Sequence, residues 1–234
     1  MLKKILKKLL PKYLRSQIEK KFKSFYAANQ LDKKMLEYIN YENGYYIEVG
    51  ANDGILQSNT LFFEKNKKWK GLLIEPIKEK YSQLINNRSN ENIFANVALV
   101  SFDYKDEYIN LSYSDLMTTT LSKKNQLDID KNLIEGKKHL NIFEKEKIIK
   151  IKAQTLNETL VKNNAPYKID FFSLDVEGFE LEVLKGIDFK NFKFKYILVE
   201  CIENFEVIKN FLRDKNYLFK KKLSHIDYLF KIDE

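Results

Sequence analysis

The sequence predicts a single α/β domain whose mostly parallel sheet has helices on both faces. From about residue 45 onward, apolar strand-like runs alternate with helix-like stretches, which is the pattern of a parallel sheet. The 234 residues, 44% of them hydrophobic, suffice for one domain with a substantial core. No internal repeat and no Gly/Ser-rich linker divides the chain, so we expect no second full domain.

The first 25 residues form a basic segment. They carry nine Lys or Arg residues and one acid, whereas the rest of the chain is balanced, although the net charge is +8. Apolar residues recur in it near helical spacing: Leu2, Ile5, Leu6, Leu9 and Leu10. This pattern predicts a basic amphipathic helix, which fits an anionic membrane or glycolipid surface, or packing against the domain or another subunit. Its apolar runs are too short for a transmembrane span.

Charge and cysteine content exclude several classes of protein. Because the basic excess lies at the N-terminus, the domain has no broadly basic face, and we expect no nucleic-acid partner. The single Cys201 forms no intrachain disulfide, and with only His139 and His225 beside it the chain offers no zinc framework. We therefore expect a cytoplasmic protein, either free or peripheral at the inner face of the membrane.

The first half of the chain predicts an N-terminal helical segment followed by three strands and two helices. A second helix over 30–41 completes a segment at 1–40, and the domain then spans 41–234. Strands are expected at 45–49, 69–75 and 93–99, and helices at 58–67 and 77–86. Pro76 ends the second strand because proline has no amide hydrogen for the ladder.

The regular pattern is lost between about residues 103 and 147. This stretch holds a hydroxyl-rich run at 112–120 and then a charged run of uncertain structure. An insertion of this length in a compact domain is usually a lid or a binding loop, and disorder is the alternative. We expect a lid or insertion at 103–147.

Regular elements return in the last third of the chain. The expected elements are strands at 148–153, 169–174 and 196–199, helices from Thr155, at 180–185 and at 204–215, and a hairpin of 217–223 with 228–232. Thr155 and Glu158 have the spacing of a capping box. Gly186 is expected to close the helix at 180–185.

Four acidic residues fall at or near the ends of predicted strands: Glu48, Glu75, Asp175 and Glu200. Ligands of open α/β sheets bind at the carboxyl ends of the strands, where the strand order reverses. The sequence therefore predicts a functional site built around these acids.

The turn after the first strand has glycines four residues apart, Gly50 and Gly54. It departs from the G-x-G-x-x-G pattern of dinucleotide enzymes, so it fits a ligand without a pyrophosphate. Glu75, 21 residues beyond Gly54, stands where a carboxylate can bind both hydroxyls of a ribose. The alternative is a structural turn with an incidental acid.

The segment D-V-E-G-F-E at 175–180, followed by L-K-G at 184–186, resembles the hallmark of the FkbM methyltransferase family. The turn E-V-G-A-N-D-G at 48–54, the S-N-T at 58–60 and the L-I-E-P at 73–76 are also similar to that family, and the resemblance spans about residues 44–232. It implies a class I methyltransferase Rossmann-like fold, with a mostly parallel seven-stranded sheet, helices on both faces and a C-terminal antiparallel hairpin. It also implies S-adenosyl-L-methionine as cofactor, with O-methylation of natural products or glycans as the usual chemistry.

Carried over position by position, the resemblance implies a cofactor site. Its residues are Glu48, Gly50, Ala51, Asn52, Gly54, Glu75, Pro76 and Asn96. The residues of the glycine turn would surround the methionine part of the cofactor, Glu75 would hold the ribose, and Asn96 would lie on the adenine side.

Methyl transfer to a hydroxyl requires a positioned acceptor and removal of its proton, because the sulfonium already activates the methyl group. Asp175 and Glu177 are the predicted catalytic residues, since a carboxylate can take that proton. Alternatively, Asp175 and Glu200 bind a divalent cation, Mg²⁺ in preference to zinc, that acidifies the hydroxyl. A further alternative is that Asp175 or Glu177 only caps the following helix.

We therefore expect an S-adenosylmethionine-dependent O-methyltransferase that acts on a small-molecule sugar, a glycan or a glycolipid. Residues 1–25 would supply a peripheral contact with a membrane or a glycolipid. Two alternatives stay open. A nucleotide-dependent enzyme of another class is disfavoured by the absent G-x-G-x-x-G, and a non-catalytic cofactor-binding scaffold is disfavoured by the four strand-end acids.

Overall fold

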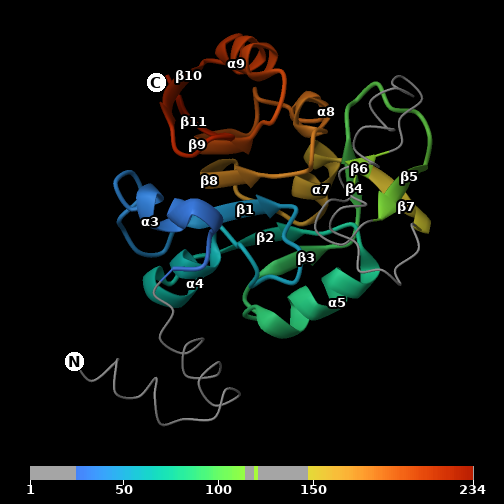
Figure 1. The fold of residues 1–234 in the computed structure, drawn as a ribbon, viewed down its shortest axis with the longest axis horizontal. Coiled ribbons are helices and arrows are strands. Elements are labelled where there is room, and N and C mark those ends of the chain that lie inside the picture. Colours follow the sequence, from blue (N-terminus) through green and yellow to red (C-terminus); the bar gives the residue numbers. More distant parts are fainter. Residues whose placement is uncertain (1–24, 114–118, 121–146, 234) are drawn as a thin grey trace.

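A computed structural model describes residues 25–113, 119–120 and 147–233, which form two sheets and the helices that pack against them (Figure 1). The larger sheet has seven strands in the order β10-β11-β9-β8-β1-β2-β3. These strands are β1 (Tyr45–Val49), β2 (Lys70–Ile74), β3 (Ile93–Ala95), β8 (Lys168–Leu174), β9 (Lys193–Glu200), β10 (Tyr217–Lys222) and β11 (Asp227–Ile232). β11 runs antiparallel to β9 and β10, and the other pairs are parallel. The predicted seven-stranded sheet with a C-terminal hairpin is confirmed.

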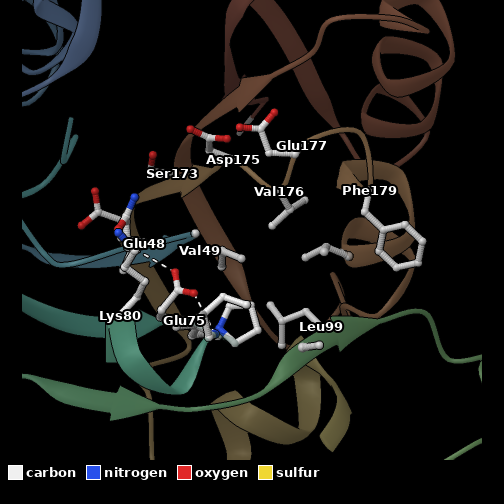
Figure 2. Close-up of a pocket in the computed structure, with 18 of the residues that line it drawn as sticks. Glu48, Val49, Glu75, Lys80, Leu99, Ser173, Asp175, Val176, Glu177 and Phe179 are labelled. Carbon is white, nitrogen blue, oxygen red and sulfur yellow. Dashed lines mark hydrogen bonds between the residues drawn. The ribbon is translucent and has the colours of Figure 1, made fainter. Parts of the chain in front are cut away.

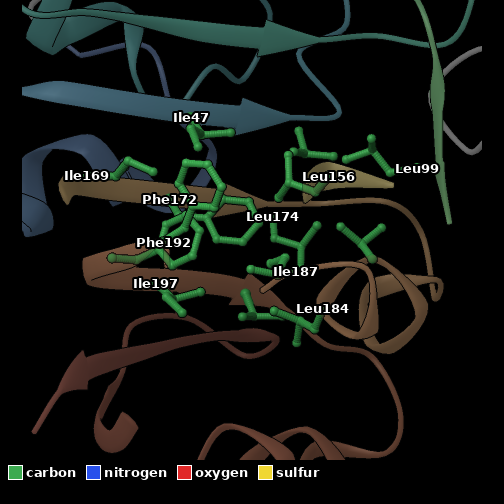
Figure 3. Close-up of a cluster of buried hydrophobic side chains, with 14 of the residues drawn as sticks. Ile47, Leu99, Leu156, Ile169, Phe172, Leu174, Leu184, Ile187, Phe192 and Ile197 are labelled. Carbon is green, nitrogen blue, oxygen red and sulfur yellow. The ribbon is translucent and has the colours of Figure 1, made fainter. Parts of the chain in front are cut away.

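Helices cover both faces of this sheet, as predicted. Because alternate side chains of a strand point to opposite faces, Ile47 and Val49 of β1 join one hydrophobic core, and Tyr46 joins the other. The first core, part of which is shown in Figure 3, packs against α7 (Leu156–Lys162), α8 (Glu180–Lys185) and α9 (Phe205–Arg213). The second packs against α3 (Leu31–Met35), α4 (Leu61–Lys67) and α5 (Lys78–Asn87).

The helix expected at 30–41 is shorter in the structure. A short 3-10 helix, η1 (Ala28–Gln30), precedes α3, and Gln30 has a positive φ of 56°, so α3 cannot extend further back. Leu31, Met35 and Ile39 are buried in the second core, which fixes this segment on the sheet. Residues 1–24, with most of the predicted basic helix, lie outside the described residues. Within the described part of the chain, no helix is both long and apolar enough to cross a membrane.

The single strand expected at 93–99 is wrong, because the chain forms two strands in two different sheets. β3 pairs with β2, whereas β4 (Ala98–Val100) pairs with β7 (Lys147–Thr155). The break lies at Asn96, whose side-chain amide donates hydrogen bonds to the carbonyl oxygens of Glu75 (2.8 Å) and Pro76 (2.9 Å). These bonds tie the chain to the end of β2 and turn it away from the larger sheet.

The second sheet has the strand order β4-β7-β5-β6 and lies beside the larger one (Figure 1). It contains β5 (Tyr108–Tyr113) and β6 (Thr119–Thr120), both within the predicted insertion at 103–147. The sequence did not predict β5, because its antiparallel partner β7 follows much later in the chain. The remaining parts of the insertion, 114–118 and 121–146, lie outside the described residues.

The two predicted helix-end signals are confirmed. The Glu158 amide donates to Thr155 Oγ1 (3.1 Å) and the Thr155 amide donates to Glu158 Oε2 (2.8 Å), so the capping box forms. α8 ends at Gly186, which has an ordinary φ of −90°. A Cβ at Gly186 would lie 2.2 Å from the carbonyl oxygen of Val100, so this glycine permits close packing of α8 on β4.

We expect Thr155→Ala to lower the free energy of unfolding by about 1 kcal/mol, the usual cost of losing an N-cap hydroxyl. Thr155→Ser retains the hydroxyl and serves as the matched control. Urea unfolding followed by circular dichroism measures all three proteins. Equal stability of the three would mean that the cap contributes nothing to the fold.

Candidate active site

A cavity of about 300 Å³ lies at the carboxyl ends of β1, β2 and β8, within the size range of small-ligand sites (Figure 2). Eight of the predicted site residues line it: Glu48, Gly50, Ala51, Asn52, Glu75, Pro76, Asp175 and Glu177. The cavity lining does not include Gly54, Asn96 or Glu200. The prediction that the strand-end acids gather at one edge of the sheet therefore agrees with the geometry.

The cavity has a polar side and an apolar side. Figure 2 shows the carboxyl groups of Glu48 and Asp175 on one side, and Leu99 and Phe179 on the other. Leu111 of β5 also lines the cavity, so the second sheet supplies part of the wall. Such a lining suits a ligand with one apolar portion and one polar portion.

The two glycines of the first turn have different structural roles. Gly50 has a positive φ of 80°, and a Cβ there would lie 1.9 Å from the carbonyl oxygen of Asp175. Only glycine therefore allows the turn after β1 to pass against the turn after β8. Gly54 also has a φ of 80°, but a Cβ there would meet the side chains of Leu84 and Arg88. Gly54 thus lets the loop pack closely against Leu84 and Arg88, and it does not line the cavity.

Glu48 lies at the end of β1 with its carboxylate bound to protein groups. Its Oε1 accepts a hydrogen bond from the backbone amide of Asn59 (2.8 Å), and its Oε2 accepts one from Thr60 Oγ1 (2.6 Å). Ser58 Oγ lies 3.0 Å from each carboxylate oxygen. These bonds occupy residues 58–60, which explains why α4 starts at Leu61 and not at the expected residue 58. The Glu48 carboxylate therefore holds residues 58–60 against the end of β1.

Arg88 neutralises the buried Glu48 and was not predicted from the sequence. It is 5% exposed, and its guanidinium donates to Glu48 Oε2 (3.1 Å), Glu64 Oε2 (2.7 Å) and Tyr46 Oη (2.8 Å). It also donates to the carbonyl oxygen of Gly54 (3.2 Å) and to Ser58 Oγ and Thr60 Oγ1. One side chain after α5 thus joins β1, the glycine turn and the start of α4.

Glu75 follows β2 and faces the cavity beside the glycine turn (Figure 2). Its Oε2 accepts a hydrogen bond from the backbone amide of Asn52, and its Oε1 accepts one from the backbone amide of Ile77, both at 2.8 Å. Burial raises the pKa of Glu75 to about 7, and these two amides and nearby Lys80 limit the increase. Each carboxylate oxygen retains acceptor capacity for a further hydrogen-bond donor.

Asp175, Glu177 and Glu200 form a cluster in which one carboxyl oxygen of each lies within 4.8 Å of the others. Burial raises the pKa of Asp175 well above its usual range, and the Glu200 carboxyl reinforces this through its charge and a hydrogen bond. Burial also raises the pKa of Glu177, to about 8, with a further contribution from Glu200. The cluster therefore holds protons near neutral pH when no cation lies beside it.

The turn after β8, which carries Asp175 and Glu177, is fixed by Glu180. Glu180 Oε1 accepts from the amides of Gly178 (2.9 Å) and Val176 (3.2 Å). In the part of the chain that the structure describes, no side-chain hydrogen bond caps α8, whose N-cap residue is Phe179. The alternative that Asp175 or Glu177 serves as a helix cap is therefore not what the structure shows. Glu177 has a positive φ of 54°, which is strained for a residue other than glycine.

Sequence reasoning assigned no role to Asn59, Ser173 or Arg88. Asn59 and Ser173 line the cavity and are joined by a hydrogen bond from Asn59 Nδ2 to Ser173 Oγ (2.9 Å). The similarity of S-N-T at 58–60 to the FkbM family was the available signal for Asn59. Ser173 lies within an apolar strand and Arg88 follows a helix, so neither stands out in the sequence.

Comparison with protein families shows which family the chain belongs to. The model of the Methyltransferase FkbM domain matches residues 48–219, a span that contains both the glycine turn and the acidic turn. The chain belongs to the FkbM methyltransferase family. The resemblance seen in the motifs is thereby confirmed, and the FkbM family consists of S-adenosylmethionine-dependent methyltransferases. A search of curated proteins finds no match to this FkbM-family chain.

Three solved methyltransferase structures resemble the chain at low sequence identity. An FkbM methyltransferase from Methylobacillus flagellatus KT is 12% identical with a TM-score of 0.46, over 83% of this chain and 45% of that one. A precorrin-6y C5,15-methyltransferase from Geobacter metallireducens GS-15 is 10% identical with a TM-score of 0.40, over 89% and 93% of the two chains. A SAM-dependent methyltransferase from Aquifex aeolicus is 13% identical with a TM-score of 0.36, over 86% of each chain. The chain's own larger sheet, with the strand order β10-β11-β9-β8-β1-β2-β3 and an antiparallel β11, has the class I methyltransferase topology that the sequence implied.

We expect the stability of this FkbM domain to fall as pH rises from about 4.5 to about 8. Glu75 and Glu180, with pKa values of about 7, and Glu177, at about 8, keep protons in the folded state that the unfolded chain releases. Ionisation therefore favours the unfolded chain over this window. Urea unfolding at pH 5 and pH 8 measures the slope, which Glu177→Gln should reduce. A slope of opposite sign would contradict the proposed protonation.

Proposed function

We propose that this FkbM-family protein transfers the methyl group of S-adenosylmethionine to a hydroxyl oxygen of a sugar, glycan or glycolipid. The observation that carries the proposal is the carboxyl cluster of Asp175, Glu177 and Glu200, of which Asp175 and Glu177 line the cavity. A hydroxyl must lose its proton as the new C–O bond forms. A carboxylate within hydrogen-bond distance can accept that proton.

Two features of the cavity lining support an adenosyl cofactor. Glu75 retains acceptor capacity for the two ribose hydroxyls, and the apolar wall at Leu99 and Phe179 suits the flat adenine ring. When bound, the cofactor supplies a methyl group on a positively charged sulfur. The protein then has to orient the two reactants and exclude competing water.

Asp175 is the proposed proton acceptor, and Glu177 lies beside it as the second candidate. In the structure, burial and the Glu200 carboxyl favour the protonated form of Asp175, in which it cannot act as a base. A positive charge in the cavity lowers the pKa of nearby carboxyls. Asp175 therefore loses its proton more readily when the cavity holds a cationic ligand, and it can then accept the proton of the acceptor hydroxyl.

The same cluster supports a second arrangement, a Mg²⁺ site held by Asp175 and Glu200 with Glu177 beside them. The donor set fits, because carboxylate oxygens are the ligands that Mg²⁺ prefers and the three groups lie within 4.8 Å of one another. A cation at this place would replace the protons that the crowded carboxyls hold. It would lower the pKa of the acceptor hydroxyl, which would then lose its proton more readily.

We further propose that residues 1–25 contact an anionic membrane surface or a glycolipid acceptor from the cytoplasmic side. Ala27 forms a parallel β-bridge with Gln57, and Gln57 lines the cavity. The chain therefore enters the described domain next to the loop that borders the active site. A basic segment that precedes this point would bring an anionic surface close to the cavity.

Titration calorimetry with S-adenosylmethionine, S-adenosylhomocysteine and NAD tests the cofactor class. We expect saturable binding of the two adenosyl ligands and no binding of NAD. Glu75→Ala should weaken adenosyl binding about tenfold to a hundredfold, as expected for lost hydrogen bonds to a charged group. Glu79→Ala, at an exposed position on α5, is the matched control. Binding of NAD alone, or of none of the three, would overturn the proposal.

A methyl-transfer assay over a panel of sugars and glycolipids tests the proton acceptor. We expect Asp175→Asn to lower turnover at least about a hundredfold, the effect of a lost general base, with little change in cofactor affinity. Glu182→Gln, on the partly exposed side of α8, is the control. Each protein is assayed with Mg²⁺ and with EDTA, because only a metal-dependent reaction stops in EDTA. Equal turnover of wild type and Asp175→Asn would remove Asp175 from the mechanism.

A further inference from the structure

Asn59, one of the residues that line the cavity, has a buried and unpaired amide oxygen. Asn59 is 8% exposed and lines the cavity, and its Oδ1 has no hydrogen-bond partner among the described residues. Buried polar atoms in folded proteins are nearly always paired, and an unpaired one requires an explanation. A ligand that donates a hydrogen bond to this oxygen would provide that explanation.

The rest of Asn59 is held firmly, so the oxygen cannot turn away. Its Nδ2 donates to Ser173 Oγ (2.9 Å) and its backbone amide donates to Glu48 Oε1 (2.8 Å). Glu48 and Ser173 are register partners on β1 and β8, so these bonds place the side chain over the junction of the two strands. The orientation of the unpaired oxygen is therefore built into the sheet.

The position of Asn59 relates it to one particular part of the proposed cofactor. Along the strand ends, Glu75 follows β2, Asn59 lies over β1 and β8, and Asp175 follows β8. The sulfur of S-adenosylmethionine carries the ribose, the methyl group and the amino-acid chain. With the ribose at Glu75 and the methyl beside Asp175, the amino-acid chain is left for the residues between them.

The chemistry around Asn59 selects one end of that chain. The unpaired amide oxygen is a hydrogen-bond acceptor, and the carboxyl of Asp175, which lines the same cavity, is an acid. The positive charge of Arg88 is already bound by Glu48 and Glu64. An ammonium group brings three donors and a positive charge to such a site, whereas a carboxylate brings only acceptors. Resting on the proposed function, we propose that Asn59 Oδ1 accepts a hydrogen bond from the ammonium group of the cofactor.

Three ligands separate this role from a structural one. S-adenosylhomocysteine carries both ends of the amino acid, decarboxylated S-adenosylmethionine carries only the ammonium, and 5′-methylthioadenosine carries neither. Calorimetry of Asn59→Ala should show binding of the first two weakened about tenfold to a hundredfold, with 5′-methylthioadenosine nearly unchanged. Asn59→Asp should restore binding, because aspartate keeps the acceptor and Ser173 can donate to it.

Asn52 provides a matched control in the same cavity. Its Oδ1 is also unpaired, but its backbone amide donates to Glu75, which places it on the ribose side. Its positive φ of 49° suits glycine, so Asn52→Gly is compatible with the backbone. We expect this variant to change the affinity for S-adenosylhomocysteine and 5′-methylthioadenosine by the same factor.

The outcomes separate the two proposals. Equal weakening of all three ligands in Asn59→Ala, no weakening at all, or weakening only of the ligand that carries a carboxylate would each overturn the role of Asn59. In each of these cases wild-type binding of the adenosyl ligands would leave the proposed function standing. A wild-type protein that binds none of the three would overturn the proposed function and the inference together.

Discussion

The buried ion pair between Arg88 and Glu48 is the interaction on which the geometry of the site depends. Removing two charges from water is costly, and the structure offsets this cost with hydrogen bonds to nearly every polar group around them. The same bonds fasten β1, the glycine turn and the start of α4 to the end of α5. One face of the loop is thereby fully hydrogen-bonded, whereas Asn52 and Asn59, which line the cavity, keep amide oxygens that are unpaired within the described part of the chain.

A second constraint couples this loop to the acidic turn. The absence of a side chain at Gly50 lets the carbonyl oxygen of Asp175 lie against the first turn, and the Asp175 amide donates to Val49 (3.2 Å). The distance between Glu75 and the acidic cluster is then set by the spacing of adjacent strands, about 4.8 Å each. The parallel sheet therefore fixes the distances between the groups that a ligand spanning β2, β1 and β8 would contact.

Local patterns predicted the larger sheet well, because hydrophobic runs and strand-end acids are properties of short segments. The capping box at Thr155 and the limits of α8 are local in the same sense. Features that depend on distant partners could not be predicted: β5 pairs with a remote strand, and Asn96 breaks a continuous apolar run by binding the end of β2. Arg88 was missed for the same reason, since a single arginine after a helix carries no sign of its partners.

The apolar wall of the cavity is assembled differently from its polar wall. The polar groups come from the ends of the central strands, whereas Leu111 comes from β5 in the neighbouring sheet. Replacing or reshaping that outer sheet would alter the volume and contour of one side of the cavity while the carboxyl groups kept their positions. Substitutions in that outer sheet therefore offer a route to a differently shaped ligand that leaves the acidic groups undisturbed.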